Sequence, residues 1–440
     1  MAEVIGIVIF ALLIALSIAL HELGHFIPAK RFGVKVTEFM IGFGPGIWKK
    51  TKGETTYGLK AIPLGGYVRM IGMLPPLKND PEGQLRRSST GRFASMISDA
   101  RQQSLEEVGP GDENRVFYKL PVRKRVIIML GGITMNLLFA AVLFSIVLVG
   151  IGLPKPSLEV GSVVVCTPSV THPTGAPLPS GNCPTGTEKT PAVQAGLLKG
   201  DLIATVNGVK VPNWEAVSSQ LRQSPGRSVV FGVNRNGTIV VVPVAVTSID
   251  RPEFDEVGNP TGKTAPSGFV GISPGVEYVA QPWTSVPSYM WEITTASAQA
   301  LVTLPARLYE LVKDTLIGGG ERAVDGPVSV VGVSRLGGDI AAMDQPILGK
   351  VATFLSLAAA LNLFLALFNL LPILPLDGGH VAGALYEAVR RWFAKVRGKP
   401  DPGPADVARL LPVAYVMAIL LVGMGVIVIW ADLVKPISLG

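Results

Sequence analysis

Charged residues are scarce in this 440-residue chain, since Asp, Glu, Lys and Arg make up 16% of it while hydrophobic residues make up 48%. So few charges exclude an ordinary soluble enzyme. Histidine and cysteine are rare, with four and two residues. Glycine and proline are frequent, with 50 and 35 residues, which excludes a chain built only of helices. The composition indicates membrane helices together with at least one soluble module.

Four apolar segments are long enough to cross about 30 Å of hydrocarbon. They predict a multi-pass α-helical membrane protein with four transmembrane helices, over residues 1–27, 126–153, 351–380 and 410–432. The first segment lacks the basic start and the small-residue cleavage site of a signal peptide, so we expect it to be retained.

Basic residues are unevenly placed along the chain. They are frequent in residues 28–125 and 390–399, whereas Met1–Glu3 and the tail after Trp430 have almost none. The positive-inside rule then places both basic loops in the cytoplasm and both termini outside. The lipid bilayer explains these clusters, and we expect no nucleic-acid partner.

The first apolar segment ends in His21-Glu22-Leu23-Gly24-His25. Residues i and i+4 share one face of a helix, so His21 and His25 can bind a single Zn²⁺ while Glu22 acts as general base on a water molecule. Ionisable groups inside a membrane span are costly, and they indicate function.

Two histidines leave a zinc site incomplete, and Asp377 offers a third ligand. It follows Pro372 and Pro375, which break the helix, and precedes two glycines. The topology places Asp377 and the histidines at similar depth, towards the cytoplasmic side. A turn residue is the alternative for Asp377. His380 is either a fourth ligand or a supporting residue, and a catalytic zinc keeps one position open.

Cys166 and Cys183, the two cysteines, fall in the long segment that the topology places outside. An even pair in an oxidising compartment predicts a disulfide. Two unpaired thiols are the alternative, because spacing alone does not fix the geometry.

With these motifs, the chain resembles the site-2 protease family of intramembrane zinc metalloproteases, in particular the bacterial type that cleaves anti-sigma factors. The resemblance rests on His-Glu-x-x-His and on Asn-x-x-Pro-x-x-Pro-x-Asp-Gly, which starts at Asn369. It implies zinc on His21, His25 and Asp377, Glu22 as base, and substrate binding by Asn369. It also implies a bacterial inner membrane, single-pass substrates already cut outside, and a cytoplasmic membrane-associated β-hairpin at about 37–72.

Residues 157–278 have a different character, with short β-branched runs between turn signals. The stretch 195–208 resembles a PDZ domain, which would lie outside and bind an extended peptide by strand addition. A β-rich spacer without a ligand is the alternative. We expect an amphipathic membrane-surface helix at 287–316 and a flexible insertion at 77–114.

Two other classes of function compete with proteolysis. A metal transporter would need several acidic or histidine side chains along a path, and the chain has four histidines in all. A non-catalytic membrane scaffold with a PDZ module would not need Glu22 as a base. We therefore expect a zinc endopeptidase acting within the bilayer.

Overall fold

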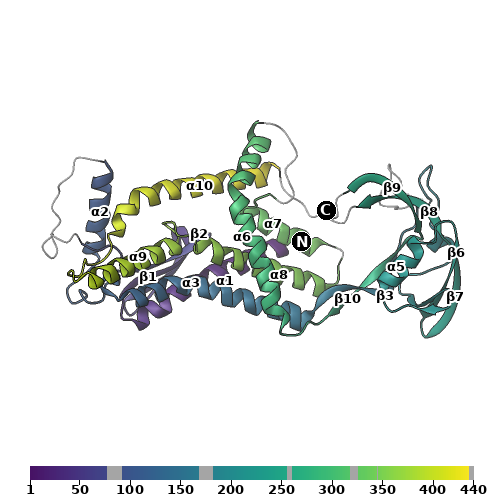
Figure 1. Cartoon of the computed structure of the whole chain (residues 1–440), viewed down its shortest axis with the longest axis horizontal. Coiled ribbons are helices and arrows are strands. Elements are labelled where there is room, and N and C mark those ends of the chain that lie inside the picture. The colour runs from purple at the N-terminus through teal and green to yellow at the C-terminus, as the bar shows by residue number, and fades with distance from the viewer. Residues whose placement is uncertain (77–91, 168–181, 255–259, 318–325, 344, 436–440) are drawn as a thin grey trace. The chain divides into compact units, whose positions relative to one another are not determined.

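The computed structural model describes the chain except for residues 77–91, 168–181, 255–259, 318–325, 344 and 436–440. It divides into two compact units (Figure 1). The first joins Met1–Ile151 to Pro282–Gly440, and the second is Gly152–Gln281.

Long apolar helices form the framework of the first unit. Within the described residues, four helices are long and apolar enough to cross a membrane: α1 (Ala2–Arg31), α3 (Val122–Ser145, continued by a π-helix over Ile146–Ile151), α8 (Ile347–Asn369) and α10 (Leu411–Val434, preceded by a 3₁₀ turn over Val407–Leu410). A helix satisfies its backbone groups internally, which a span in lipid requires. α1, α3 and α8 pack against one another.

The range predicted for the third span, 351–380, contains parts of two helices, divided at the prolines that were expected to break it. α8 ends at Asn369, and a separate helix, α9, covers Asp377–Val396. Pro372 and Pro375 lie in the seven residues between them, where they have no N–H to donate. α9 and a further helix, α7 (Val330–Ala342), were not anticipated.

The segment predicted as an amphipathic helix forms α6 (Ser285–Val312), followed by a π-helix over Lys313–Ile317. It contacts α8 and α3, and Figure 1 shows it crossing the direction of those helices.

The predicted hairpin consists of β1 (Val36–Lys52) and β2 (Thr55–Met70). Each strand is bent back on itself. The pairing shows this, since the first part of β1 is paired with β2 on both of its sides. Glu38 is paired with Arg69 and Thr56, and Ile41 with Gly66 and Leu59. The result is an antiparallel sheet of four strand segments, with the second half of β2 at one edge.

The insertion at 77–114 is only partly as expected. Residues 77–91 lie outside the described residues, but α2 covers Arg92–Glu106. A flexible insertion is wrong for this helix, because Arg101 and Ser104 are buried where it packs. A short 3₁₀ turn, Phe117–Lys119, leads into α3.

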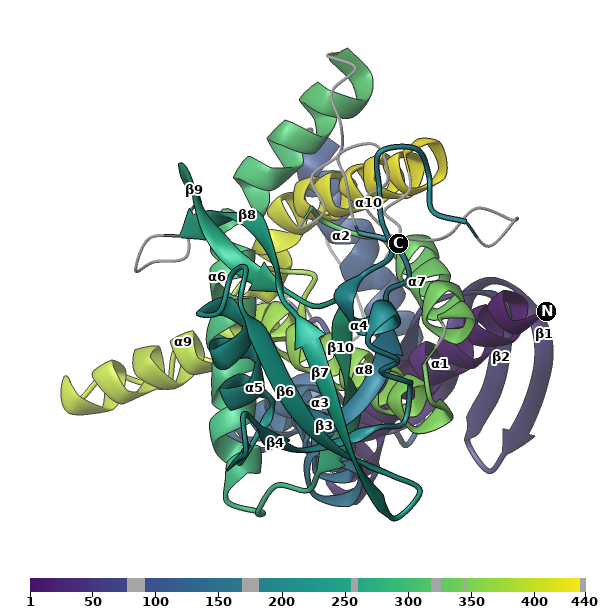
Figure 2. The ribbon, with the colours of Figure 1, turned by 90° about the vertical axis from the view of Figure 1, so that its right-hand side faces the viewer.

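The second unit is mainly β-structure. Its sheet has the order β10-β3-β4-β6-β7, with β5 paired to β4, and β8 and β9 form a separate pair. The strands are β3 (Leu153–Val163), β4 (Leu202–Val206), β5 (Val209–Lys210), β6 (Ser228–Arg235), β7 (Thr238–Ala245), β8 (Thr247–Phe254), β9 (Pro260–Phe269) and β10 (Ile272–Val279). The helices are α4 (Pro191–Gln194) and α5 (Trp214–Arg222). In Figure 2 this unit faces the viewer.

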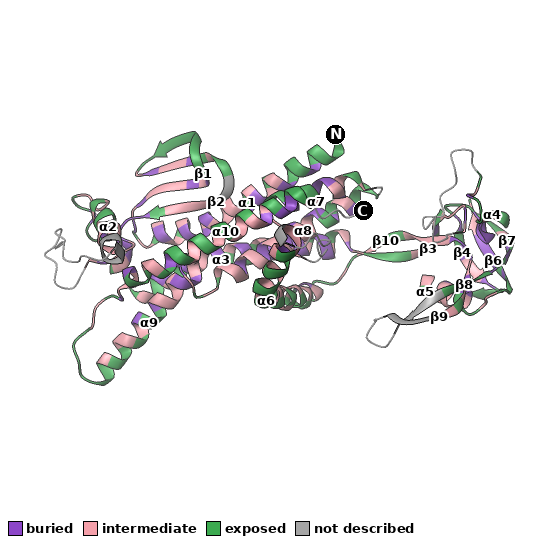
Figure 3. Cartoon of the chain, turned by 90° about the horizontal axis from the view of Figure 1, so that it is seen from above, coloured by how far each residue is buried: buried purple, intermediate pink, exposed green. Residues whose placement is uncertain are grey.

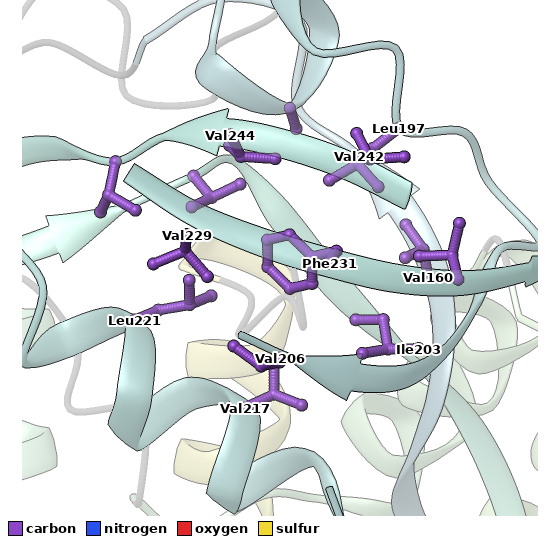
Figure 4. Packing of buried hydrophobic residues seen from close by; sticks show 14 of the residues in the cluster. Val160, Leu197, Ile203, Val206, Val217, Leu221, Val229, Phe231, Val242 and Val244 are labelled. Atoms are coloured by element: carbon purple, nitrogen blue, oxygen red, sulfur yellow. The ribbon is translucent and has the colours of Figure 1, made fainter. Parts of the chain in front are cut away.

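One hydrophobic core holds this unit together. Val217 and Leu221 of α5 face Val229 and Phe231 of the sheet (Figure 4). The turn signals at 207–208 and 236–237 form tight connections in which all four residues have positive φ, with Asn207 at 52° and Asn236 at 53°. Asn-Gly supplies this geometry with little strain.

Candidate metal and catalytic site

Three side chains predicted as ligands come together in the first unit. His21 and His25 lie one turn apart on α1, and Asp377 is the first residue of α9. Asp377 Oδ2 is 3.3 Å from His21 Nε2 and 3.2 Å from His25 Nε2, and the two Nε2 atoms are 3.3 Å apart.

These spacings fit one metal ion. Ligand atoms about 2.0–2.1 Å from a tetrahedral zinc lie roughly 3.3–3.4 Å from one another. Two imidazoles and one carboxylate are also a donor set that zinc accepts, and three protein ligands leave a fourth position for water or substrate. Among the described residues, these three form the one group of three or more His, Cys or acidic side chains whose ligand atoms are close enough to share a metal ion.

The turn before α9 explains how Asp377 reaches the histidines. A Cβ on Gly378 would lie 2.3 Å from the carbonyl oxygen of Leu371, and one on Gly379 would lie 2.6 Å from the nitrogen of Leu374. Real Cβ atoms do not approach so closely, so the chain can fold back here only with glycine at both positions. The glycines thus fix Asp377 at the start of the helix.

His25 is oriented by the backbone of α3. Its Nδ1 lies 2.8 Å from the carbonyl oxygen of Ile128. Only a protonated Nδ1 can donate to a carbonyl, so the neutral ring keeps its lone pair on Nε2, the atom that faces Asp377. The ring of His25 therefore has the tautomer that a metal ligand needs.

Small residues let α3 approach the two histidines, a feature not predicted from the sequence. A Cβ on Gly132 would lie 2.3 Å from His25 Nε2 and 2.7 Å from His21 Cε1. Directly beside this contact, Gly24 and Gly131 meet, and an added Cβ on either would lie within 2.2 Å of the other's carbonyl oxygen. The Gly131-Gly132 pair inside an apolar run was the available signal.

Glu22 is 8% exposed and lies next to the hairpin. A Cβ on Gly66 of β2 would come within 2.8 Å of Glu22 Cγ. The sheet edge therefore passes directly over the predicted base, at a contact that only glycine allows.

The remaining predicted residues lie elsewhere. Asn369, the last residue of α8, is half-buried and separated from Asp377 by the turn. His380 lies in the first turn of α9, outside the group of three ligands. In the second unit, Cys166 and Cys183 form a disulfide with a Cα–Cα distance of 5.5 Å.

A polar contact between α1 and α8 was also not predicted from the sequence. Asn362 of α8 is fully buried, and its Nδ2 donates to Ser17 Oγ at 2.8 Å. Ser17 lies one turn before His21 on α1 and in turn donates to the carbonyl oxygen of Leu13. The contact ties α8 to the zinc-motif helix.

Comparison with known proteins finds a peptidase family and several zinc metalloproteases. The family model described as "Peptidase family M50" matches residues 9–400. The zinc metalloprotease Rip1 of Mycobacterium tuberculosis is 35% identical over all of both chains, and Rip1 of Mycolicibacterium smegmatis is 32% identical over 99% of this chain and 98% of its own. The zinc metalloprotease RasP of Oceanobacillus iheyensis is 27% identical over 97% and 98%.

Proposed function

The chain belongs to peptidase family M50 and is a membrane-integrated zinc metalloprotease, and from this premise we propose that it cleaves its substrates inside the bilayer with Glu22 as the catalytic base. The convergence of His21, His25 and Asp377 at 3.2–3.3 Å carries the proposal. Family membership favours proteolysis over the transporter and the scaffold.

The proposed reaction is hydrolysis of a peptide bond. Bound zinc would act as a Lewis acid and make water a better nucleophile near neutral pH. Glu22 accepts a proton from the water molecule that attacks the scissile carbonyl. It then gives that proton to the amide nitrogen as the carbon–nitrogen bond breaks. His21, His25 and Asp377 would hold the ion.

Substrate binding must expose an amide that a helix would hide. A membrane span keeps its carbonyls bonded within the helix, so the substrate has to be extended at the cleavage point. The edge of β2 at Gly66 lies over Glu22, and an extended segment could pair with it. Asn369, at the open end of α8, is proposed to hold the freed substrate backbone.

A cavity of about 540 Å³ among α6, α8 and α10 supports access from the lipid. It is lined mainly by apolar side chains, including Phe364, Phe368 and Val428. Phe368 directly precedes Asn369. A substrate span entering here would meet the proposed binding residue at the end of α8.

The sides of the membrane are proposed from charge. Both termini lie outside, and the hairpin, α2 and α9 lie in the cytoplasm of a bacterial cell, because their loops carry the basic residues. The active site then opens towards the cytoplasm. Labelling of single cysteines introduced at Lys52 and Lys399 with a membrane-impermeant reagent tests this arrangement, since both should react only after the cells are opened.

The second unit is proposed to be a PDZ domain. A cavity of about 190 Å³ lies between α5 and residues 268–274, where an extended peptide could add to the sheet.

Single-span membrane proteins such as anti-sigma factors are the proposed substrates, after another protease has removed their outer part. The PDZ module would then admit only shortened substrates.

A cleavage assay tests the proposed function. The purified full chain is reconstituted with a trimmed single-span reporter, beside the Glu22→Gln variant. Cleavage by the parent and loss of cleavage with retained zinc in the variant is the expected result, since the base is removed and the ligands stay. Cleavage that survives in Glu22→Gln would assign the base elsewhere.

A further inference from the structure

A groove runs along the outer edge of β2, from the residue that follows Gly66. It is a cavity of about 320 Å³, lined by Tyr67, Arg69 and Met70 on one side and by Ala100, Gln103 and Glu107 on the other. Four consecutive β2 residues, 67–70, line it. Successive side chains of a strand point to opposite faces of the sheet, so the groove follows the strand edge and not one face. In the part of the chain that the structure describes, this stretch of β2 pairs with β1 alone.

The first groove residue on β2 comes one position after the residue that contacts the proposed base. Gly66, where an added Cβ would touch Glu22, directly precedes Tyr67 on β2. An extended chain that leaves the zinc site along this edge would therefore enter the groove after about one residue, since a strand advances about 3.3 Å per residue.

The second wall is α2, and two contacts hold it in place. The backbone N–H of Leu74 donates to Ser104 Oγ at 3.3 Å. Arg101, 4% exposed, forms an ion pair with Asp406. Ala100, Gln103 and Glu107 recur at helical spacing, so one face of α2 is turned towards β2 while Arg101 is anchored elsewhere.

Charge in the groove favours a basic occupant. The Arg69 guanidinium lies 3.3 Å from Glu38 but 3.9 Å from Glu107. Glu38 also accepts from the Tyr67 hydroxyl, to which Lys60 donates, so Glu107 is the less compensated of the two carboxylates. Burial raises the pKa of Glu107, which Arg69 only partly offsets. A lysine or arginine arriving beside Glu107 would compensate its charge.

We propose that this groove binds, in extended form, the basic flank that follows the substrate's membrane span on the hairpin side. The inference rests on the proposed function. Flanks on the cytoplasmic side of membrane spans are rich in Lys and Arg, so such a flank has the charge that Glu107 favours. The insertion helix α2 thereby becomes a substrate-binding element, and the edge of β2 supplies the main-chain contacts.

The test uses two synthetic single-span peptides and the full chain in lipid vesicles. One peptide carries a ten-residue flank with alternating Lys and Ser, and the other ends directly after the span. Gln103→Trp fills the groove, and Gln102→Trp is its matched control, because Gln102 is exposed and bonded to Glu106 instead. Zinc content and thermal midpoint of each variant report folding.

For Gln103→Trp we expect KM for the flanked peptide to rise about tenfold, which corresponds to about 1.4 kcal/mol, with kcat and the KM of the flankless peptide unchanged. Glu107→Gln should raise KM for the flanked peptide alone. Gln102→Trp should change neither peptide. Equal effects on both peptides, or none on the flanked one, would overturn the proposal.

Crosslinking separates this proposal from the proposed function. A photoreactive benzoylphenylalanine replaces Gln103 or Gln102 in the Glu22→Gln background. A crosslink to the flanked peptide from position 103, and none from 102, supports the groove even if the parent cleaves neither peptide. Cleavage by the parent without a crosslink from position 103 would reject the groove and leave the peptidase intact.

Discussion

Single glycines decide whether the site can form. Gly132 lets α3 lie against the rings of His21 and His25, and Gly66 lets the sheet edge lie against Glu22. Protein interiors are closely packed, so even one added methyl group must displace its neighbours. At these two positions the neighbours are the proposed zinc ligands and the proposed base.

Gly132→Ala should weaken zinc binding. The added Cβ would overlap His25 Nε2, so the ring must move away from Asp377. We expect at least a tenfold loss of zinc affinity, measured by competition with a chelator. Gly423→Ala is the control, because Gly423 on α10 has open space at its Cβ position, and alanine there should slightly favour the helix. Equal affinity in both variants would show that the histidines tolerate the extra volume.

Asp201 makes the second unit sensitive to acid. It is 1% exposed and accepts two hydrogen bonds from Arg235 at 2.7 Å. Arg235, together with the N–H of Leu198, holds the pKa of this carboxyl below its usual value despite the opposing effect of burial. A lowered folded-state pKa gives stability that is present above the unfolded value of about 3.9 and is lost as pH falls through the folded value.

We therefore predict that acid destabilises the second unit below about pH 4, and that Asp201→Asn removes much of this dependence. Hydrogen exchange of β4 and β6 in the full chain measures it. Glu215→Gln is the control, since Glu215 is exposed and 3.8 Å from Arg222. A pH dependence unchanged by Asp201→Asn would assign the acid response to other carboxylates.

Among the elements, α9 links the proposed metal site to the N-terminal end of α3. Asp377 begins this helix, and Glu387, with 0% exposure, forms ion pairs with Arg125 of α3 and with Arg391. Glu387 also accepts from the N–H of Ala405 at 2.8 Å. The C-terminal half of α9 is exposed or half-buried apart from Glu387 (Figure 3), so this buried carboxylate is its main polar anchor to α3.

Glu387→Gln should destabilise the first unit and loosen Asp377. Removing one partner of a buried ion pair leaves the charge of Arg125 uncompensated, at a cost of about 3–5 kcal/mol. We expect a lower thermal midpoint and weaker zinc binding. Arg409→Gln is the control, because Arg409 is 79% exposed in its pair with Asp406 and such pairs contribute about 0–1 kcal/mol. Similar midpoints in both variants would contradict the role of this anchor.

The sequence predicted the elements with strong local signals. Apolar runs marked the helices that became α1, α3, α8 and α10, and Asn-Gly pairs marked tight turns. α9 was missed because its basic residues Arg390, Arg391 and Lys395 were used only to assign a membrane side. α2 was missed because its stability comes from the contacts of Arg101 and Ser104 with distant segments.

Across the whole molecule, the candidate site depends on contacts that no local pattern contains. The proposed zinc ligands could be predicted, since His-Glu-x-x-His and the Asp-Gly turn are each recognisable in the sequence. The approach of Gly131 to Gly24, the bond from His25 to Ile128 and the sheet edge over Glu22 could not. They arise from close packing of segments distant in sequence, which depends on small residues whose role appears only in three dimensions.

The central claim is that α1 and α9 build one zinc site, and zinc content tests it most directly. Zinc per molecule is measured by mass spectrometry in the purified parent, in Asp377→Ala and in Asp401→Ala, whose carboxylate is 62% exposed and 3.5 Å from Arg391. We predict about one zinc in the parent and in Asp401→Ala, and a clear loss in Asp377→Ala. Equal zinc in all three would remove Asp377 from the site and contradict the account.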